Sequence, residues 1–445
     1  MDTLISNATV VTMNPRMDVL FGGYIGICDG KITYVGKEPP AEQPEKIVDG
    51  TGMVAIPGLV NAHTHLITTV LRNYIDDADS HEALEMLLQK TAKLDAKGAK
   101  ASALLGIAEC LRFGITSVSD LGEFPEAVAE AAAGSGIRAN IALAANRFAD
   151  AAEEFDFEED PQCQTLSRLV DRWHGYDNGR LRIDAGIYAE YTSNHPLWEA
   201  LAAYAKEKGL GMQLHLAETE EEAESCRERT GLDPAVLLDC HGFFSVPVTA
   251  AGCVALTEEE RSILAKAKAT AVATPLAYAK AGNQATPISD TVKAGINVAL
   301  GTGGAVECGN LDLFEMMRAA VLEQRKLDGK ASGMPAMAAL MMATVCGGRA
   351  QGRADTTGML QEGMDADIVL VDFSAPHLMP CHNVLSSLVF SAKGGDVAMT
   401  MVGGKILYQN GQFPTIDLQE VLKELTESTI PLLFSDDKGG NYGGQ

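Results

Sequence analysis

The stretch GLVNAHTHL, residues 58–66, places two histidines directly after a short apolar run. Side chains two residues apart in a strand point to the same face. His63 and His65 are therefore expected to project together from the end of one strand. Imidazole pairs with this spacing are typical of metal ligands, although two polar loop histidines would give the same pattern.

Strand-like and helix-like segments alternate through the middle of the chain. For example, LRIDAGIYAEY (181–191) precedes PLWEALAAYAKEKG (196–209). Strand–helix units of this length join parallel strands. Five clear units of this kind, together with strand-like runs at 55–63, 114–120 and 268–275, predict an α/β fold in which eight parallel strands form a barrel.

The two ends of the chain contain strand-like segments without the alternating helices. β-branched, partly alternating runs broken by turn signals fill the first 57 residues, and similar runs return after residue 360. Both ends are therefore expected to pair into one small β-domain. The predicted division is 1–57 and 361–415 for this β-domain, 58–360 for the barrel, and 416–445 for a helix with a loose glycine-rich tail.

Composition argues against several classes of partner. The net charge is −25, with 60 acidic and 35 basic residues, and such a chain is repelled by nucleic acid and by anionic lipid. No apolar run reaches the roughly 18 residues that a membrane-spanning helix needs. Nine scattered cysteines without a CxxC pair indicate reduced thiols, so we expect a cytoplasmic protein without a disulfide framework.

A third histidine and an acid occur together in LHLAE, residues 214–218. His215 ends another predicted barrel strand, and barrel enzymes place their chemistry at the carboxyl ends of the strands. Three imidazoles suit zinc or iron and leave room for an activated water. Glu218 is a candidate general acid and base. The alternative is that Glu218 only opens the acidic helix that follows, where carboxylates suit the helix dipole.

Longer blocks of sequence, among them GLVNAHTHLITTVLRNYIDD, GIAECLRFGITSVSD and GMLQEGMDADIVLVDF, resemble the amidohydrolase superfamily. The likeness is strongest to its aromatic aminohydrolase branch, which includes S-adenosylhomocysteine/methylthioadenosine deaminases, guanine deaminases and triazine hydrolases. The resemblance implies a distorted (β/α)8 TIM barrel and a small β-sandwich built from both termini. It also implies hydrolytic removal of an amino group from a small heterocyclic or nucleoside-like substrate, by a homo-oligomer that is a dimer or tetramer.

The resemblance also assigns roles to individual residues. Members of this branch bind one divalent metal, zinc in the first place and iron as an alternative, and His63, His65 and His215 match three of its ligands. Glu218 matches the glutamate that transfers protons. Glu82 falls near the position of an acid that contacts ribose hydroxyls, but the match is loose, and the sequence favours a solvated helix residue there.

The family pattern breaks on the face where the chemistry takes place. Gly303, in GTGGA, stands where the fourth ligand, an aspartate, is usual, and Gly252, in AGC, stands where a histidine that contacts water is usual. Tyr188 replaces a histidine after the fourth strand. ATPLAY, residues 273–278, lacks most polar groups of the usual turn after the seventh strand. These losses predict a depleted centre whose metal is weakly bound or absent.

Other side chains are candidates to compensate for these losses. Glu307, Cys308 and Cys253 follow the two glycines closely enough to be replacement ligands, and the sequence does not choose among them. Tyr188 and Glu190, on the loop after the fourth strand, are candidate substrate-binding residues.

Three hypotheses for the function remain open from the sequence. The first is a divergent metal-dependent amidohydrolase that cleaves a non-peptide C–N bond. The second is a non-catalytic relative that binds a small ligand or supports an active paralogue. The third is an enzyme of changed reaction type, such as an isomerase or a lyase. The intact HxH and HLAE motifs favour the first hypothesis, whereas Gly252 and Gly303 favour the other two.

Overall fold

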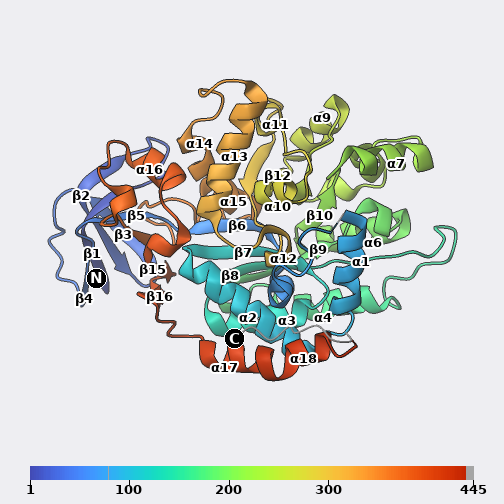
Figure 1. The fold of residues 1–445 in the computed structure, drawn as a ribbon, viewed down its shortest axis with the longest axis horizontal. Helices are drawn as coiled ribbons and strands as arrows, with labels where there is room; N and C mark the ends of the chain where they lie inside the picture. The colour runs from blue at the N-terminus through green and yellow to red at the C-terminus, as the bar shows by residue number, and fades with distance from the viewer. Residues whose placement is uncertain (79, 437–445) are drawn as a thin grey trace.

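The fold of the chain, seen in a computed structural model, contains two sheets that lie side by side (Figure 1). The structure describes residues 1–78 and 80–436. One sheet forms the wall of a barrel, and the other is built from the two ends of the chain. The predicted α/β class, with a TIM barrel and a small β-domain from both termini, is confirmed.

Eight parallel strands follow one another around the barrel in chain order. They are β6 (Leu59–Thr64), β7 (Ile115–Gly122), β8 (Arg138–Leu143), β9 (Leu181–Gly186), β10 (Met212–Leu216), β11 (Val248–Gly252), β12 (Thr270–Ala273) and β13 (Asn297–Leu300). The barrel closes where the carbonyl of His63 accepts hydrogen bonds from the backbone N–H groups of Thr302 (3.0 Å) and Gly303 (3.1 Å). The closing seam therefore runs beside the first histidine of the motif.

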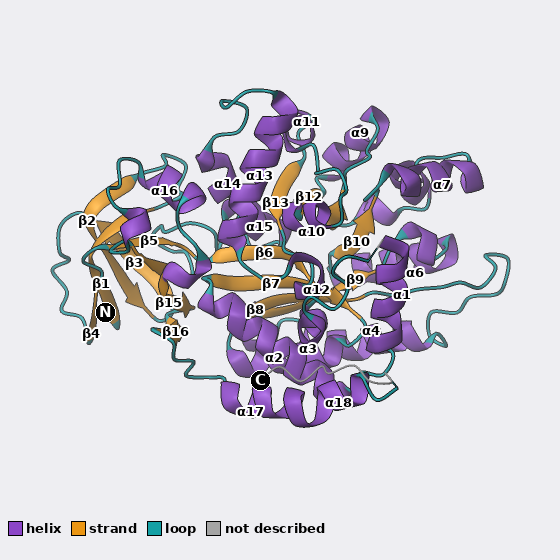
Figure 2. Cartoon of the chain, viewed as in Figure 1, coloured by secondary structure: helices purple, strands orange, loops and turns teal. Residues whose placement is uncertain are grey.

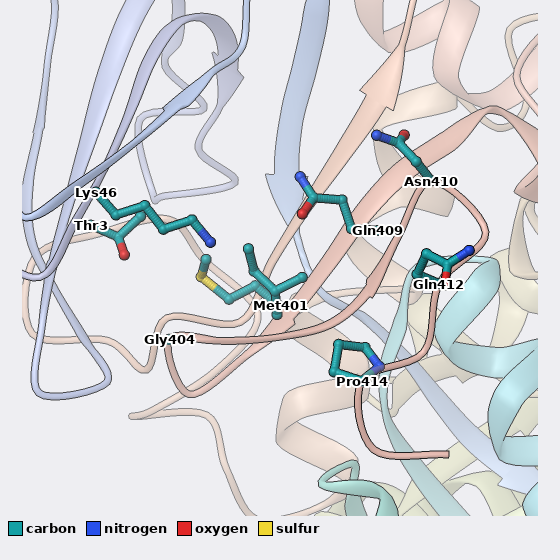
Figure 3. A pocket seen from close by; sticks show the side chains of 9 residues that line it. Thr3, Lys46, Met401, Gly404, Gln409, Asn410, Gln412 and Pro414 are labelled. Carbon is teal, nitrogen blue, oxygen red and sulfur yellow. The ribbon is translucent and has the colours of Figure 1, made fainter. Parts of the chain in front are cut away.

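The terminal sheet has the order β16-β15-β14-β5-β1-β2-β3, and β4 pairs with β1. Its strands are β1 (Thr3–Val11), β2 (Val19–Cys28), β3 (Lys31–Gly36), β4 (Lys46–Asp49), β5 (Met53–Pro57), β14 (Ile368–Asp372), β15 (Val397–Val402) and β16 (Lys405–Gln409). The antiparallel pair β5–β14 joins the N-terminal and C-terminal contributions. A hollow of about 660 Å³ opens on this sheet, beside Thr3, Lys46 and Met401 (Figure 3).

The run at 55–63, predicted as one strand, is two strands that meet at Gly58. β5 belongs to the terminal sheet and β6 to the barrel, so the chain changes sheet within one residue. A Cβ at Gly58 would lie 2.1 Å from the Thr116 hydroxyl oxygen, which is closer than any side chain tolerates. Glycine is therefore required where the two sheets meet.

The α-helices of the described residues lie mostly around the barrel strands (Figure 2). They are α1 (Ser80–Thr91), α2 (Ala96–Arg112), α3 (Pro125–Ser135), α4 (Pro161–Trp173), α5 (Tyr176–Gly179), α6 (His195–Lys208), α7 (Glu220–Thr230), α8 (Pro234–Cys240), α9 (Glu258–Ala267), α10 (Pro275–Lys280), α11 (Ile288–Lys293), α12 (Ala305–Cys308), α13 (Leu313–Asp328), α14 (Ala336–Met342), α15 (Val345–Ala350), α16 (Val384–Phe390), α17 (Leu418–Glu424) and α18 (Ile430–Leu433). Near the C-terminus, α17 packs on α2.

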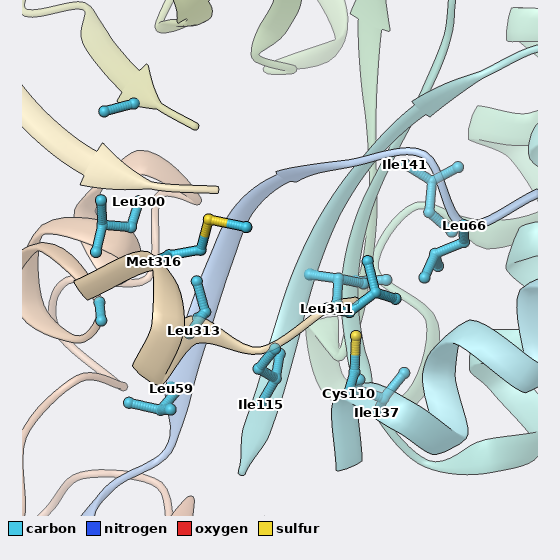
Figure 4. Close-up of a cluster of buried hydrophobic side chains, with 14 of the residues drawn as sticks. Leu59, Leu66, Cys110, Ile115, Ile137, Ile141, Leu300, Leu311, Leu313 and Met316 are labelled. Atoms are coloured by element: carbon cyan, nitrogen blue, oxygen red, sulfur yellow. The ribbon is translucent and has the colours of Figure 1, made fainter. Parts of the chain in front are cut away.

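The main apolar core lies between the barrel strands and these helices. Leu59 of β6, Ile115 of β7 and Met316 of α13 are fully buried and belong to one cluster (Figure 4). Burial of a side chain of this size contributes about 1.5–3 kcal/mol before entropy is counted. This packing holds the strands in place, so that their carboxyl ends can carry the polar site.

The boundaries predicted for the domains stay a prediction. Residues 437–445, which include the expected glycine-rich tail, lie outside the described residues. Within residues 1–78 and 80–436, no helix has both the length and the apolar character that a bilayer crossing requires.

Candidate metal centre and active site

Three imidazoles converge at the carboxyl ends of the barrel strands. His63 is the penultimate residue of β6, His65 follows that strand, and His215 lies near the end of β10. The Nε2 atom of His215 lies 3.2 Å from the Nε2 atom of His63 and 3.2 Å from that of His65. The structure thus brings together all three residues that the sequence singled out as metal ligands.

Backbone carbonyls fix the orientation of two of these rings. Nδ1 of His65 lies 2.6 Å from the carbonyl oxygen of Leu121, and Nδ1 of His215 lies 2.9 Å from that of Tyr188. Because a carbonyl only accepts, each Nδ1 carries the hydrogen, and in the neutral ring each Nε2 presents a lone pair. Outer hydrogen bonds of this kind orient metal-binding histidines.

Burial keeps His63 and His215 uncharged at neutral pH. It lowers the pKa of His63 well below its usual value, and it lowers that of His215 to about 4, with the neighbouring His65 acting in the same direction. The three Nε2 atoms lie close enough together for one cation to accept a lone pair from each ring. These residues therefore fit a divalent metal of the zinc or iron class.

Glu218 reaches the same mouth of the barrel because the chain turns sharply after β10. Ala217 has a φ of 46°, and the backbone N–H groups of Ala217 and Glu218 both donate to the Glu222 carboxylate, at 3.0 and 2.7 Å. Loss of water around Glu218 raises its pKa to about 7, despite an opposing hydrogen bond. A carboxyl group with this pKa exchanges protons readily near neutral pH.

The space at Gly252 is filled by a tyrosine. A Cβ added there would lie 2.9 Å from the Tyr278 hydroxyl oxygen and 2.8 Å from a Glu218 methylene carbon. The Tyr278 hydroxyl, from α10, donates to a carboxylate oxygen of Glu218 at 2.8 Å. The loop after the seventh strand, which the sequence analysis described as having lost most of its polar groups, thus contributes a hydroxyl to the site.

Neither candidate cysteine points toward the histidines. The Cys253 thiol faces the carbonyl of Ala250, and that of Cys308 faces the carbonyls of Gly304 and Asn310. Burial raises the pKa of both thiols, that of Cys308 to about 12, so both stay protonated at neutral pH. A protonated thiol is a poor metal ligand, and the geometry does not favour either cysteine as a replacement.

A cavity of about 550 Å³ opens over the histidines, and Glu218, Tyr278 and Glu307 also line it. Drug-sized ligands occupy cavities of about 300–1,000 Å³, so a heterocycle or nucleoside fits. The cavity mouth lies near α1 and α10, with Ala83 and Lys280 among the lining residues.

The three predicted substrate contacts lie in different surroundings. Tyr188 lines the cavity, and its ring centroid lies 4.7 Å from that of His215. Glu190 is buried and accepts a hydrogen bond of 2.6 Å from Arg229, so its carboxylate is paired outside the cavity lining. Glu82 is exposed on α1, next to the cavity-lining Ala83.

Some residues of the site were missed by sequence reasoning. Asp120 near the end of β7 accepts from the backbone N–H of Leu66 at 2.7 Å, and burial raises its pKa to about 6. Its position at the carboxyl end of a predicted strand was the available signal. Glu222 lies only four residues after Glu218, and Thr219 followed three residues later by a glutamate is a pattern typical of a helix start. Tyr278 gave no such signal, because it reaches Glu218 only through the fold.

The chain is similar to known proteins over nearly its whole length. The model of the amidohydrolase family matches residues 54–407. A 5′-deoxyadenosine deaminase from Methanosarcina mazei is 36% identical over 97% of this chain and 98% of its own length. A 5-methylthioadenosine/S-adenosylhomocysteine deaminase from Moorella thermoacetica is 35% identical over 95% of this chain and 98% of its own.

Solved structures agree with these relatives. An adenosine deaminase from Xanthomonas campestris with bound zinc superposes with a TM-score of 0.90 at 27% identity, over 98% of this chain and 99% of its own. An atrazine chlorohydrolase from Arthrobacter aurescens in complex with zinc gives 0.87 at 25% identity, over 97% and 100%. Among the three hypotheses for the function, these findings favour the hydrolase that acts on non-peptide C–N bonds. The chain belongs to the amidohydrolase family.

Proposed function

We propose that this chain is a zinc-dependent deaminase that hydrolyses the exocyclic amino group of an adenine nucleoside modified at its 5′ position. The observation that carries this proposal is the meeting of three imidazoles with a carboxyl group of pKa about 7 at one barrel mouth. The substrate class is supported by relatives that are named as 5′-deoxyadenosine and 5-methylthioadenosine/S-adenosylhomocysteine deaminases.

A divalent cation held by His63, His65 and His215 would supply an activated water near neutral pH. The oxygen of such a water would add to the ring carbon that bears the amino group, and the C–N bond would then break to release ammonia. Protonated Glu218 would give its proton to the ring nitrogen, take a proton from the added water and deliver it to the departing amine. It would regain a proton from the remaining hydroxyl group as the carbonyl of the product forms. Its pKa of about 7 makes it nearly as ready to give a proton as to take one.

Other residues of the cavity position the substrate. The Tyr278 hydroxyl holds the Glu218 carboxyl group through their hydrogen bond. The Tyr188 ring offers an apolar face to the base, beside His215. Glu82 is the proposed contact for ribose hydroxyls, from α1 at the cavity mouth.

Ammonia release from a panel of nucleosides tests the proposal. The zinc-loaded chain is expected to deaminate 5′-deoxyadenosine and methylthioadenosine with a higher kcat/KM than adenosine. Cytidine serves as the negative control, because its amino group lies on a smaller ring. If no member of the panel releases ammonia from a chain that holds zinc, the proposed activity is wrong.

Replacement of Tyr278 by phenylalanine tests the tyrosine–glutamate pair through the pH profile. The Tyr278 hydrogen bond favours the charged carboxylate and so lowers the pKa of Glu218. Its removal raises that pKa, and the inflection that Glu218 contributes to kcat is expected to move to higher pH. Tyr191→Phe is the matched control, because that hydroxyl makes no hydrogen bond to Glu218 in the described part of the chain. An unmoved inflection in Tyr278→Phe would show that the bond does not tune the catalytic proton.

We further propose zinc over iron as the resident metal, a homo-oligomeric assembly and a cytoplasmic location. Bound zinc in the two similar structures supports the first. Nine free cysteines support a reducing compartment. The assembly rests on family resemblance alone, and sedimentation analysis tests it.

A further inference from the structure

We propose that Glu307 is the carboxylate partner of the metal centre, in place of the aspartate that Gly303 lacks. This inference rests on the proposed function only for the presence of a metal. It concerns a residue of the short helix α12, not of a barrel strand. The centre would then be rebuilt from a neighbouring element instead of being depleted.

The Glu307 carboxylate occupies the space that a side chain at position 303 would fill. A Cβ built on Gly303 would lie 2.5 Å from Oε2 of Glu307. This is comparable with the separation between Cβ and the carboxylate oxygens within an aspartate. A carboxylate oxygen therefore stands close to where a strand-end aspartate would present its own.

Position 303 is directly connected to the histidine cluster. The backbone N–H of Gly303 donates to the carbonyl of His63 at 3.1 Å. A Cβ on the next residue, Gly304, would lie 3.4 Å from Cβ of His65. Glu307 shares the cavity lining with both of these histidines. The carboxylate thus lies on the same wall as the proposed metal ligands.

The local fold holds Glu307 in this place. α12 begins after Gly304, and Glu307 is the third residue of the helix, so its side chain curls back toward the helix start. Oε2 accepts from the backbone N–H of Gly304 at 2.7 Å. A Cβ at position 304 would lie 2.3 Å from the Thr68 hydroxyl oxygen. Glycine at this position therefore allows the start of α12 to pack closely against Thr68.

Glu307 acts as an outer partner of the centre. Among the described residues, the ligand atoms that lie within 4.8 Å of one another here belong to His63, His65 and His215 only. A carboxylate outside this set stabilises the cation by its negative charge. Loss of such a partner typically lowers metal affinity by about 10- to 100-fold.

Zinc affinity, measured by chelator competition on the purified full chain, tests this role without any need for turnover. Glu307→Gln is expected to bind zinc about 10- to 100-fold more weakly than the unchanged chain. Asp76→Asn is the matched control, since Asp76 lines the same cavity and is ion-paired with Lys280. It removes one negative charge, and its zinc affinity is expected to stay close to that of the unchanged chain.

A rescue variant separates loss of the carboxylate from damage to α12. Gly303 has a φ of 65°, a conformation that aspartate tolerates better than most residues. Gly303→Asp combined with Glu307→Gln is expected to regain most of the lost zinc affinity. Gly303→Asp alone is expected to melt at a lower temperature than the combined variant, because its new carboxylate lies against the like charge of Glu307, whereas glutamine at position 307 is neutral.

The zinc-affinity measurements can fail independently of the deamination assay. Zinc bound equally tightly by Glu307→Gln and the unchanged chain would overturn the inference and leave Glu307 as a helix-capping residue. Failure of the combined variant to regain affinity would also overturn it, as would absence of measurable zinc binding by the unchanged chain. If zinc affinity depends on Glu307 but no nucleoside is deaminated, the inference stands and the proposed function fails.

Discussion

Replacement of Glu218 by glutamine is expected to lower kcat by about 10²- to 10⁴-fold, the usual cost of losing a general acid–base group. Glutamine keeps the size of the side chain and still accepts the hydrogen bond from Tyr278 through its amide oxygen. It cannot give or take the protons that the water, the ring nitrogen and the leaving amine exchange. The loss is therefore expected in kcat, with little change in KM.

A control variant and a stability measurement show whether the loss of kcat comes from Glu218 itself. Glu220→Gln is the matched control, because Glu220 is exposed in the first turn of α7, and it is expected to leave kcat unchanged.

The stability of the metal-free chain gives the second measurement. Because burial raises the folded-state pKa of Glu218 from 4.5 to about 7, ionisation of Glu218 opposes folding as the pH rises through this range. The metal-free Glu218→Gln variant is thus expected to melt no lower than the unchanged chain at pH 8. Full kcat in this variant would remove Glu218 from the mechanism.

Much of the fold could be predicted, because the barrel repeats one unit. Each apolar run followed by an amphipathic helix gives the same local signal, and eight such strands are present. The predicted domain division changes between residues 57 and 58, but the predicted strand runs through Gly58, since an apolar run with a single glycine also describes one continuous strand. The steric reason for that glycine is Thr116, which lies far away in the sequence.

The histidines of the site could also be predicted, for a local reason. His63 and His65 share a face through strand periodicity, and His215 lies at a strand end, so two short motifs locate three ring positions. The two partners of Glu218 differ in this respect. Glu222 lies four residues along the chain, in the first turn of α7, so its contact is local. Tyr278 comes from α10, and only the packing of that helix at the barrel brings it there.

At Gly252 and Gly303, the side chains that fill the site could not be predicted from the sequence. Read along the chain, Gly252 and Gly303 are losses, and they predict a depleted centre. In space, a Tyr278 hydroxyl oxygen and a Glu307 carboxylate oxygen stand 2.9 and 2.5 Å from the positions that their Cβ atoms would take. A side chain from another part of the chain can thus occupy the space that a glycine leaves empty. A comparison of sequences position by position detects the lost side chain but not the one that takes its place.

Replacement of His215 by glutamine is expected to have the largest effect on the metal. His215 is the ring whose Nε2 lies 3.2 Å from both other rings, so its loss leaves only two imidazoles that cannot enclose a cation. Zinc affinity is expected to fall by more than the roughly 100-fold upper range for an outer partner. His377→Gln is the matched control, because His377 is exposed and paired with Asp396.

The same variant also tests whether the three rings act as one site. After removal of metal by a chelator, the unchanged chain is expected to regain about one zinc per chain and its deaminase activity together, whereas His215→Gln regains neither. Metal analysis of both proteins after dialysis gives the result directly. Retention of one tightly held zinc by His215→Gln would mean that the cation sits elsewhere, and the convergence of three lone pairs would then have no role in the reaction. The distances argue against that outcome, because the three Nε2 atoms already lie close enough together to hold one cation.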